Sequence, residues 1–237
     1  MTGSDDPFQL ALRLMLSLDP ALVEIIRLSL EVSLAAVALA MVLGLPLGAL
    51  LALTRFPGRG AVTVLVNALM GLPPVVVGLT VYLLLSRSGP LGELGLLFTP
   101  AAMVVAQTIL VLPIVAALSR QALAELWQDY RDGFASLDVP WPRAALTMVW
   151  DARFTLVTAV LAGYGRAAAE VGAIILVGGN IAGYTRTMTT AIALETSKGN
   201  LPLALALGII LLAIVLAVNA LAGSVGAWGR RRQGVAG

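Results

Sequence analysis

The sequence predicts an all-α, polytopic integral membrane protein with about five transmembrane helices and a polar two-helix loop on one side of the membrane. Its composition is 59% hydrophobic and 12% charged, with a mean hydropathy of +0.95, far above the apolar share of soluble domains. Long uncharged runs recur along the chain, and a single long polar segment, 120–153, divides them into two groups. Runs of this length match the apolar thickness of a bilayer, so we expect helices that cross it.

The residue types that are missing exclude several kinds of site. Because the sequence has no cysteine and no histidine, it lacks thiolate metal sites, disulfides and the most common general base. Its single lysine, Lys198, stands in ETSKGN, which is not the glycine-rich loop that binds nucleotide phosphates. We therefore expect no catalytic residue, no metal, no cofactor and no ATP hydrolysis by this chain. A net charge of +2 is too small to indicate a nucleic-acid partner.

Residues 1–19 are predicted to form a short helix on the membrane surface, with a disordered tail as the alternative. The segment carries acids where a signal peptide carries cations. Asp6 followed by Pro7 is a typical helix start, and Asp19 followed by Pro20 repeats the pattern.

The first span is expected at 21–54. No charge occurs from Val32 to Thr54, a run of about 23 residues that rises about 35 Å as a helix and exceeds the apolar core of a bilayer. Within it, Gly44 and Gly48 form a GxxxG pair, which suits either packing inside one subunit or contact between subunits.

The second span is expected at 61–86 and contains two adjacent prolines, Pro73 and Pro74. Prolines in mid-membrane leave backbone carbonyls without helical partners. The pair predicts either a break that lines a pathway or a kinked helix that only packs. A loop with a possible short helix follows, over 86–100.

Three more spans and a tail complete the expected order, at 97–119, 154–177, 200–228 and 229–237. The orientation follows from the cations in the connecting segments, because the richer side is cytoplasmic. One side has Arg55, Arg59, Arg120, Arg131, Arg143, Arg153 and Arg230 to Arg232, and the other has Arg13, Arg27, Arg87, Arg186 and Lys198. We therefore expect the N-terminus outside, and the segment 120–153 and the C-terminus in the cytoplasm.

The polar segment is predicted to form two short helices joined by a stiff turn. Charges alternate with aromatic and leucine side chains over 125–137, the sequence VPWP then stops the helix, and a second helix can begin at Arg143. Such a pair suits insertion into a groove on a soluble partner. The alternative is an amphipathic loop on lipid headgroups, but these are usually strongly basic and this segment is not.

Three stretches carry a resemblance to a known family: LALTRFPGRG, ALMGLPPVVVGLTVYLLLSRSGPLG and AAAEVGAIILVGGNIAGYTRTMTTAIALE. Together with the layout of the spans, they resemble permease subunits of binding-protein-dependent ABC importers for molybdate, sulfate and tungstate. The similarity covers about 19–227 and is greatest to the tungstate-specific permeases.

The resemblance implies that the polar loop enters a cleft of a separate ATPase. The superfamily signature is Glu-Ala-Ala, three residues, Gly, and a later Leu-Pro. Here Asp132, Gly133 and Phe134 occupy the first three positions, Asp138 stands in place of the glycine, and Trp150-Asp151 replaces Leu-Pro. The expected coupling residues are Tyr130, Asp132, Gly133, Phe134 and Asp138.

Two charged residues interrupt the fourth span. Arg166 and Glu170 are four apart, so on one helix they can pair. An ionised group at this depth costs roughly 2.5–3.5 kcal/mol on insertion scales and is usually paired and functional. A structural ion pair and a role at the translocation path both stay open.

The segment 178–190, GGNIAGYTRTMTT, is rich in glycine and hydroxyl groups. Facing outward, it suits an outer gate or a receiver of the binding protein, with a plain connecting loop as the alternative. The expected path or gate residues are Pro73, Pro74, Arg166, Glu170, Asn180, Thr185 and Arg186.

The leading hypothesis is an alternating-access transport subunit in the inner membrane that is not itself an enzyme. Its expected partners are a second copy, cytoplasmic ATP-binding subunits, a periplasmic or lipoprotein substrate-binding protein and membrane lipid. The resemblance implies tungstate as substrate, with molybdate or sulfate as alternatives. A proton-coupled secondary transporter that uses Glu170 is the second class, although no internal repeat or second mid-membrane acid supports it. A membrane enzyme is the third, and the sequence offers it no reactive cluster.

Overall fold

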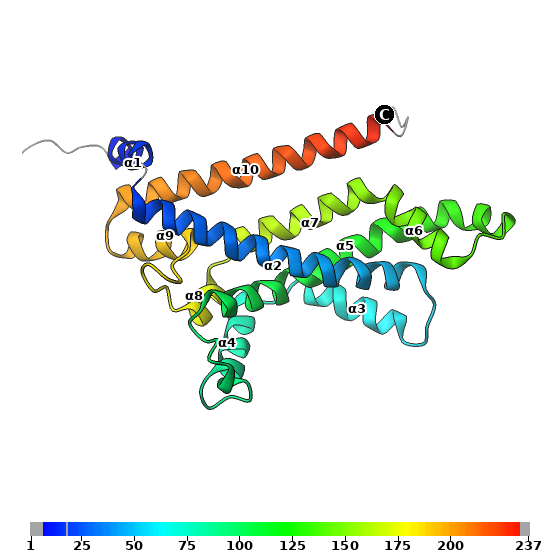
Figure 1. Cartoon of the computed structure of the whole chain (residues 1–237), viewed down its shortest axis with the longest axis horizontal. Helices are drawn as coiled ribbons and strands as arrows, with labels where there is room; N and C mark the ends of the chain where they lie inside the picture. The colour runs from blue at the N-terminus through cyan, green and yellow to red at the C-terminus, as the bar shows by residue number, and fades with distance from the viewer. Residues whose placement is uncertain (1–6, 18, 233–237) are drawn as a thin grey trace, which may run out of the picture. The chain divides into compact units, whose positions relative to one another are not determined.

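The computed structural model describes residues 7–17 and 19–232, and each regular element in these ranges is helical. The elements follow one another along the chain as α1 (Pro7–Leu16), α2 (Pro20–Leu53), α3 (Arg59–Leu69), α4 (Pro74–Leu85), the 3-10 turn η1 (Gly92–Leu94), α5 (Pro100–Ser136), α6 (Trp141–Asp151), α7 (Arg153–Ala168), α8 (Gly172–Gly178), α9 (Met188–Ser197) and α10 (Leu201–Arg232) (Figure 1). The prediction of an all-α, polytopic membrane protein is confirmed.

Among these elements, α2, α5 and α10 are each long and apolar enough to cross a membrane alone. Two further spans are possible as bent pairs, α3 with α4 at 102° and α6 with α7 at 65°. The expected five spans are reached when each bent pair counts as one. With 34 and 37 residues, α2 and α5 rise about 50–55 Å and exceed the apolar core of about 30 Å.

Both predicted helix starts near the N-terminus are confirmed. α1 begins at Pro7 and α2 begins at Pro20. The Asp19 carboxylate accepts hydrogen bonds from the amides of Ala21 and Leu22, at 2.9 and 3.3 Å, and so satisfies two of the free amides in the first turn of α2. On α1, Phe8 and Leu12 are exposed, as in a helix that lies against lipid. Residues 1–6 of the predicted interfacial segment lie outside the described part.

The helices differ from the expected bounds at three places. The fourth span, 154–177, is not one helix, because α7 ends at Ala168 and α8 begins at Gly172. The first helix of the polar segment is not a separate element, because α5 runs without a break from Pro100 to Ser136. The C-terminal helix passes the expected end at 228 and continues to Arg232. In α5, no proline or glycine stands between Pro113 and Gly133, so nothing in the backbone stops the helix at the membrane edge.

Contacts divide the chain into two compact units. The first contains the described residues within Met1–Ala36, Pro73–Gln107 and Ala167–Ala217, and the second those within Val37–Leu72, Thr108–Arg166 and Val218–Gly237. α2, α5 and α10 each contribute residues to both units.

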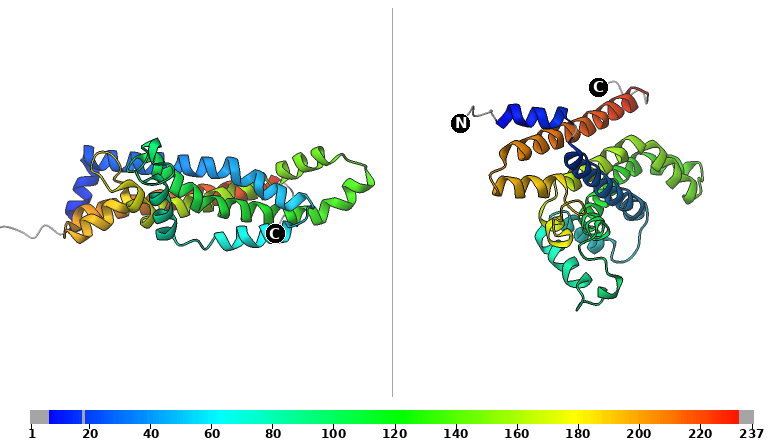
Figure 2. Two further views of the ribbon diagram at one scale, coloured as in Figure 1. Left: turned by 90° about the horizontal axis from the view of Figure 1, so that it is seen from below. Right: turned by 60° about the vertical axis from the view of Figure 1, so that its left-hand side comes forward.

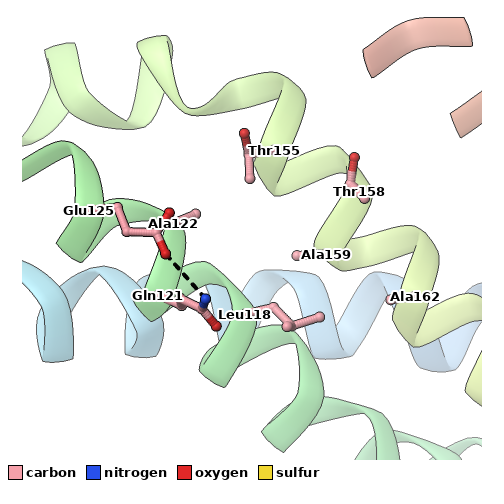
Figure 3. Close-up of a pocket in the computed structure, with 8 residues that line it drawn as sticks. All are labelled: Leu118, Gln121, Ala122, Glu125, Thr155, Thr158, Ala159 and Ala162. Carbon is pink, nitrogen blue, oxygen red and sulfur yellow. Dashed lines mark hydrogen bonds between the residues drawn. The ribbon is translucent and has the colours of Figure 1, made fainter. Parts of the chain in front are cut away.

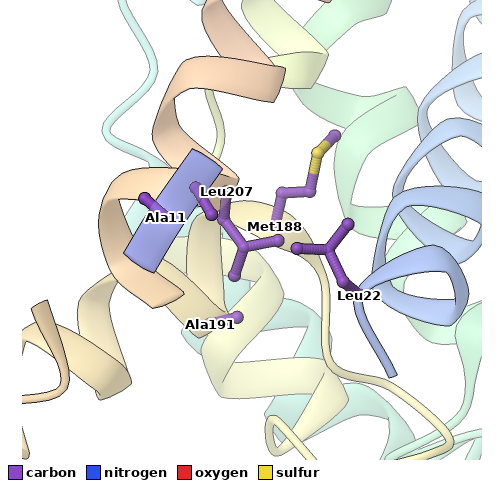
Figure 4. Close-up of a cluster of buried hydrophobic side chains, with 6 residues drawn as sticks. Ala11, Leu22, Met188, Ala191 and Leu207 are labelled. Atoms are coloured by element: carbon purple, nitrogen blue, oxygen red, sulfur yellow. The ribbon is translucent and has the colours of Figure 1, made fainter. Parts of the chain in front are cut away.

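In the first unit, a cluster of buried apolar side chains joins α1, α2, α9 and α10 (Figure 4). Its members are Ala11, Leu22, Met188, Ala191, Ala206 and Leu207. The buried Ser29 hydroxyl of α2 accepts a hydrogen bond of 2.7 Å from the Met188 amide and so anchors the start of α9. Small residues such as Ala11, Ala191 and Ala206 allow these helices to approach closely.

In the second unit, the GxxxG pair of α2 packs on α5. A Cβ added to Gly48 would stand 2.7 Å from the Ala116 carbonyl oxygen, and one added to Gly44 would stand 3.1 Å from Val115 Cγ1. Both glycines therefore permit close helix contact inside one chain, which supports the first of the two alternatives for this motif.

Candidate functional site

The polar segment folds as a helical hairpin, here called the α5–α6 hairpin and defined as residues 120–151. The end of α5 forms its first helix and α6 forms its second, and Figure 2 shows the two helices running back along one another. The turn between them contains Asp138 with a left-handed φ of 48° and ends at Pro140, which precedes the first residue of α6. The left-handed residue and the proline together stop α5 and redirect the chain.

An apolar core holds the hairpin to the end of α2. Its buried members are Ala52, Leu53, Leu123, Met148, Ala152 and Leu156. The indole Nε1 of Trp141 also donates a hydrogen bond of 3.4 Å to the Leu53 carbonyl oxygen. The hairpin is therefore a packed extension of the helix bundle, and its position is determined by α2.

The predicted coupling residues divide into two groups. Asp132, Gly133 and Asp138 are exposed near the tip, and Tyr130 is exposed on the preceding turn. Phe134 instead faces inward: it packs on the hairpin core, and its ring centroid lies 5.6 Å from that of Tyr130 and 6.3 Å from that of Trp127. Tyr130 also donates a hydrogen bond to Asp151 of α6. Tyr130 and Phe134 thus link the two helices of the hairpin.

Sequence reasoning missed the most exposed apolar residue at the tip. Leu137 is 76% exposed, and it directly follows the last residue of α5. An apolar side chain at the end of a polar hairpin is a typical anchor for a partner's pocket. The available signal for Leu137 was its position between Phe134 and Asp138. Because Leu137 and Phe134 are three residues apart, however, the helical pattern places them next to each other and does not distinguish them.

A groove of about 210 Å³ separates α5 from α7 beside the hairpin. In Figure 3, Thr155 and Thr158 on α7 stand across from Gln121 and Glu125 on α5. Gln121 Nε2 donates a hydrogen bond of 3.1 Å to Glu125 Oε1. This groove could not be predicted from the sequence, because its two walls are more than 25 positions apart in the chain.

The second span is broken at the predicted prolines. α3 ends at Leu69, α4 begins at Pro74, and their axes differ by 102°. Pro73 is the residue before the first turn of α4, with a φ of −66° that suits the entry into a helix. The chain is therefore broken at Pro73 and Pro74, as predicted, while the role of this break in lining a pathway stays a prediction.

Close backbone packing holds α4 against α8. A Cβ added to Gly78 would stand 2.7 Å from Ala173 Cα and 3.2 Å from the Ala173 carbonyl oxygen. Gly172 similarly faces Val75 and Pro74 at the start of α4. The segment after the proline break is therefore fixed on the short helix that follows Glu170.

Arg166 and Glu170 do not lie on one helix, as their spacing had predicted, and an ion pair between them stays a prediction. Arg166 lies in the last turn of α7, whereas Glu170 lies in the break before α8. Glu170 is only 2% exposed, and its Oε1 accepts a hydrogen bond of 3.0 Å from the Ala173 amide. Its backbone oxygen accepts a bond of 2.8 Å from Thr189 Oγ1. Glu170 thus holds together α8 and the start of α9.

Replacing Glu170 tests this positioning role. We expect Glu170→Ala to lower stability by about 1–3 kcal/mol, because it leaves the buried Ala173 amide without its acceptor. Glu170→Gln keeps an acceptor oxygen and should lose less than half as much. Thermal unfolding of both variants in detergent measures the difference. Equal midpoints for Glu170→Ala and the wild type would contradict the role.

The predicted outer segment is a loop, 179–187, between α8 and α9. Asn180 has a left-handed φ of 51°, and Thr185 is fully buried with its hydroxyl bonded to the Gly178 carbonyl oxygen at 2.5 Å. Arg186 Nη2 lies 3.5 Å from the Asn180 carbonyl oxygen. The structure therefore brings Asn180, Thr185 and Arg186 together at one turn, with Thr185 in a structural position.

Two side-chain atoms at this turn have hydrogen-bonding capacity that is not used. Asn180 Oδ1 and Arg186 Nε are buried and have no hydrogen-bond partner among the described residues. This turn thus contains one acceptor and one cationic donor that the described residues do not satisfy. Within the described ranges, no three acidic side chains gather in the way that a metal ion requires.

Comparison with known proteins gives a consistent result. The chain is 50% identical over 205 residues to a probable anion ABC transporter permease protein of Haloferax volcanii, which covers 84% of this chain and 88% of the relative. It is 38% identical over 213 residues to the tungstate uptake system permease protein TupB of Peptoclostridium acidaminophilum, covering 90% and 93% of the two chains. No protein-family model matches the chain.

A more distant relative extends the pattern. The molybdenum transport system permease protein ModB of Azotobacter vinelandii is 31% identical over 175 residues, covering 70% of this chain and 77% of the relative. Identity and coverage of this extent, over a helical chain with three to five candidate spans, show common descent with one kind of membrane protein. The chain belongs to the permease proteins of ABC transporters that include the tungstate and molybdenum permeases.

Proposed function

We propose that this chain is the transmembrane subunit of an ATP-driven importer whose substrate is tungstate. The observation that carries the proposal is its match to a tungstate permease over nine-tenths of both chains. A second tungstate permease, from Campylobacter jejuni, is 39% identical over 214 residues. The molybdenum permease and a sulfate permease are less similar, at 31% and 29% identity, so molybdate and sulfate are the alternatives.

The working importer contains two copies of the chain, two cytoplasmic ATPase subunits and an external binding protein. The described part of one copy supplies at most five spans, and the sequence has no visible internal inverted repeat, so a second copy is needed to enclose a path. ATP binding and hydrolysis in the partner subunits open the path alternately to the two sides of the membrane. The permease itself is not an enzyme.

The chain lies with its N-terminus outside and its C-terminus in the cytoplasm. Arginine is in excess on the side that holds the end of α2, the α5–α6 hairpin and the end of α10, and such an excess marks the cytoplasmic side. The hairpin then faces the ATPase, and the loop 179–187 faces the binding protein.

Coupling works through the tip of the hairpin. Leu137 inserts into a pocket of the ATPase, while Asp132, Gly133 and Asp138 provide the polar rim around it. Tyr130 and Phe134 act from within, because they hold the two hairpin helices together. Movement of the ATPase is thereby passed to α5 and α6 and, through the hairpin core, to the end of α2.

The path and its gate involve the breaks in the helices. Pro73 and Pro74 mark one break and Glu170 marks the other, and exposed backbone in a membrane is tolerated where it is covered by protein or lines a wet cavity. Arg166, at the end of α7, and Arg186, beside Asn180 and Thr185, supply the positive charge that a dianion needs along the way. A conduit requires weak contacts, because it must release its cargo.

Uptake by proteoliposomes that contain the permease, its ATPase and the cognate binding protein tests the proposal. We expect ATP-dependent accumulation of tungstate, with tungstate itself the strongest competitor and molybdate and sulfate at least tenfold weaker. Mass detection of the trapped metal gives the measurement. Equal competition by sulfate would move the substrate assignment to that anion, and accumulation without ATP would favour a proton-coupled transporter.

A further inference from the structure

Three arginines line a cavity of about 390 Å³ at the end of α2, in the second unit. Arg55 and Arg59 come from the turn between α2 and α3 and from the start of α3, and Arg131 comes from α5. Trp127 and Gln128 of α5 complete the polar wall. Since no carboxylate lines the cavity, its wall carries a charge of +3 that no acid of the lining offsets.

The cationic groups are available to a ligand to different degrees. Arg59 is fixed by the protein, because its Nε and Nη2 donate hydrogen bonds of 2.7 and 3.3 Å to the carbonyl oxygens of Leu51 and Ala52 at the end of α2. Arg55 is exposed and makes no hydrogen bond or ion pair with any residue that the structure describes. Arg131 meets only the neighbouring Asp132, at 3.3 Å and largely exposed, a pair worth little in water.

The same face of α5 has a further unmet donor. Arg120 precedes Ala124 by one turn, and Ala124, Trp127 and Arg131 follow it along that face and line the cavity. Arg120 Nε is buried and has no acceptor among the described residues. Arg120 itself does not line the cavity, but it extends the positive charge along this face of α5.

From the end of the uncharged run of α2, we infer that the cavity lies at the depth of the lipid headgroups. The uncharged run of α2 ends at Thr54, and Arg55 is the first charge after it. Leu53 packs with Leu123 of α5, so the first cavity residue of α5, Ala124, lies at the same level. Side chains on a helix lean toward its N-terminus, which brings the Arg131 guanidinium back toward the level of Ala124. Tryptophan, such as Trp127, is enriched at the headgroup level of a membrane.

We propose that this cavity binds the phosphate group of an anionic membrane lipid, held between Arg55, Arg59 and Arg131 with Trp127 against the glycerol region. The chemistry that the arginines recognise is a phosphate-type oxyanion. Of its two sources, a lipid headgroup and a free anion in solution, the depth of the cavity favours the lipid. Since Arg131 stands beside Asp132, the bound lipid would also brace the α5–α6 hairpin from its membrane side.

The test titrates phosphatidylglycerol or phosphatidylcholine into the full-length permease, purified with its ATPase in detergent, and counts bound lipid by native mass spectrometry. We expect the wild type to prefer phosphatidylglycerol. Arg55→Gln and Arg131→Gln should each weaken this binding about fivefold, and the double variant about 25-fold. Arg143→Gln removes an exposed arginine of α6 that does not line the cavity, and it should change nothing.

Several results would overturn the proposal. Unchanged lipid binding in the double variant would show that the cavity is not the site. An equal loss in Arg143→Gln would show that general surface charge attracts the lipid. Displacement of phosphatidylglycerol by tungstate or inorganic phosphate at comparable concentrations would assign the cavity to a soluble anion. Because none of these readings uses transport, they are independent of which anion the importer carries. Thermal unfolding without added lipid checks that the variants fold.

Discussion

Leu137→Asp is expected to abolish stable association of the permease with its ATPase while leaving the permease folded. Leu137 is 76% exposed at the tip of the α5–α6 hairpin and is not among the side chains of the hairpin core. Its replacement therefore costs the fold little, but it places a charge where a partner's apolar pocket would close over it. Truncation or charging of such an anchor typically costs 2 kcal/mol or more of binding energy, that is about 30-fold in affinity or more.

Co-purification of a tagged ATPase, with the ATPase rate stimulated by the loaded binding protein as a second readout, measures the effect. Leu137→Met is the matched control, because methionine keeps the apolar volume, and it should retain association. Phe134→Asp and deletion of residues 132–138 should also lose association, but through damage to the hairpin core and a lower unfolding midpoint. Normal co-purification of Leu137→Asp would reject the docking mode.

Gly78→Ala is expected to destabilise the first unit by about 1–3 kcal/mol, because it overpacks the contact between α4 and α8. The new Cβ would stand 2.7 Å from Ala173 Cα, which is a backbone atom and cannot move aside by a change of rotamer. Ala173 is itself held by the hydrogen bond from its amide to Glu170, so α8 resists the shift that would relieve the clash.

Thermal unfolding in detergent, followed by size-exclusion chromatography, compares Gly78→Ala with Gly208→Ala. Gly208 lies in α10 of the same unit, and a Cβ added there meets nothing within 4 Å. The control should be neutral or slightly stabilising, since alanine has the higher helix propensity. If both variants unfold at the wild-type midpoint, the α4–α8 contact is looser than described.

Much of the fold follows from local chemistry that the sequence displays. Pro7 and Pro20 begin helices because a proline at the first helical position loses no backbone hydrogen bond, and Asp19 adds a cap. Pro73 and Pro74 lie inside an apolar run, where a proline removes a backbone hydrogen bond of the helix, and they therefore break the second span. Because these signals are local, they can be recognised in the sequence without knowing which residues pack nearby.

The errors arise where a local pattern and a tertiary contact compete. The mostly apolar stretch 154–177 predicted one helix, yet the helix α7 ends at Ala168, and the Glu170 carboxylate accepts a hydrogen bond at the start of α8. The family resemblance implied a coupling role for Phe134 but not its position, which is inside the hairpin against Trp127 and Tyr130. Neither contact has a sequence signature, because each depends on which side of a helix a neighbour covers.

By itself, the sequence determined that this is an apolar, helical, membrane-spanning chain with one polar hairpin, no reactive cluster and a family resemblance to ABC permeases, because composition, uncharged run length and proline positions act locally. Only the tertiary structure decided that Leu137 is the exposed tip, that Glu170 is a buried cap, and that Arg55, Arg59 and Arg131 share one cavity. The physical reason is distance along the chain: Arg131 lies more than 70 positions from Arg55, and only the packing of α5 against the end of α2 brings them together.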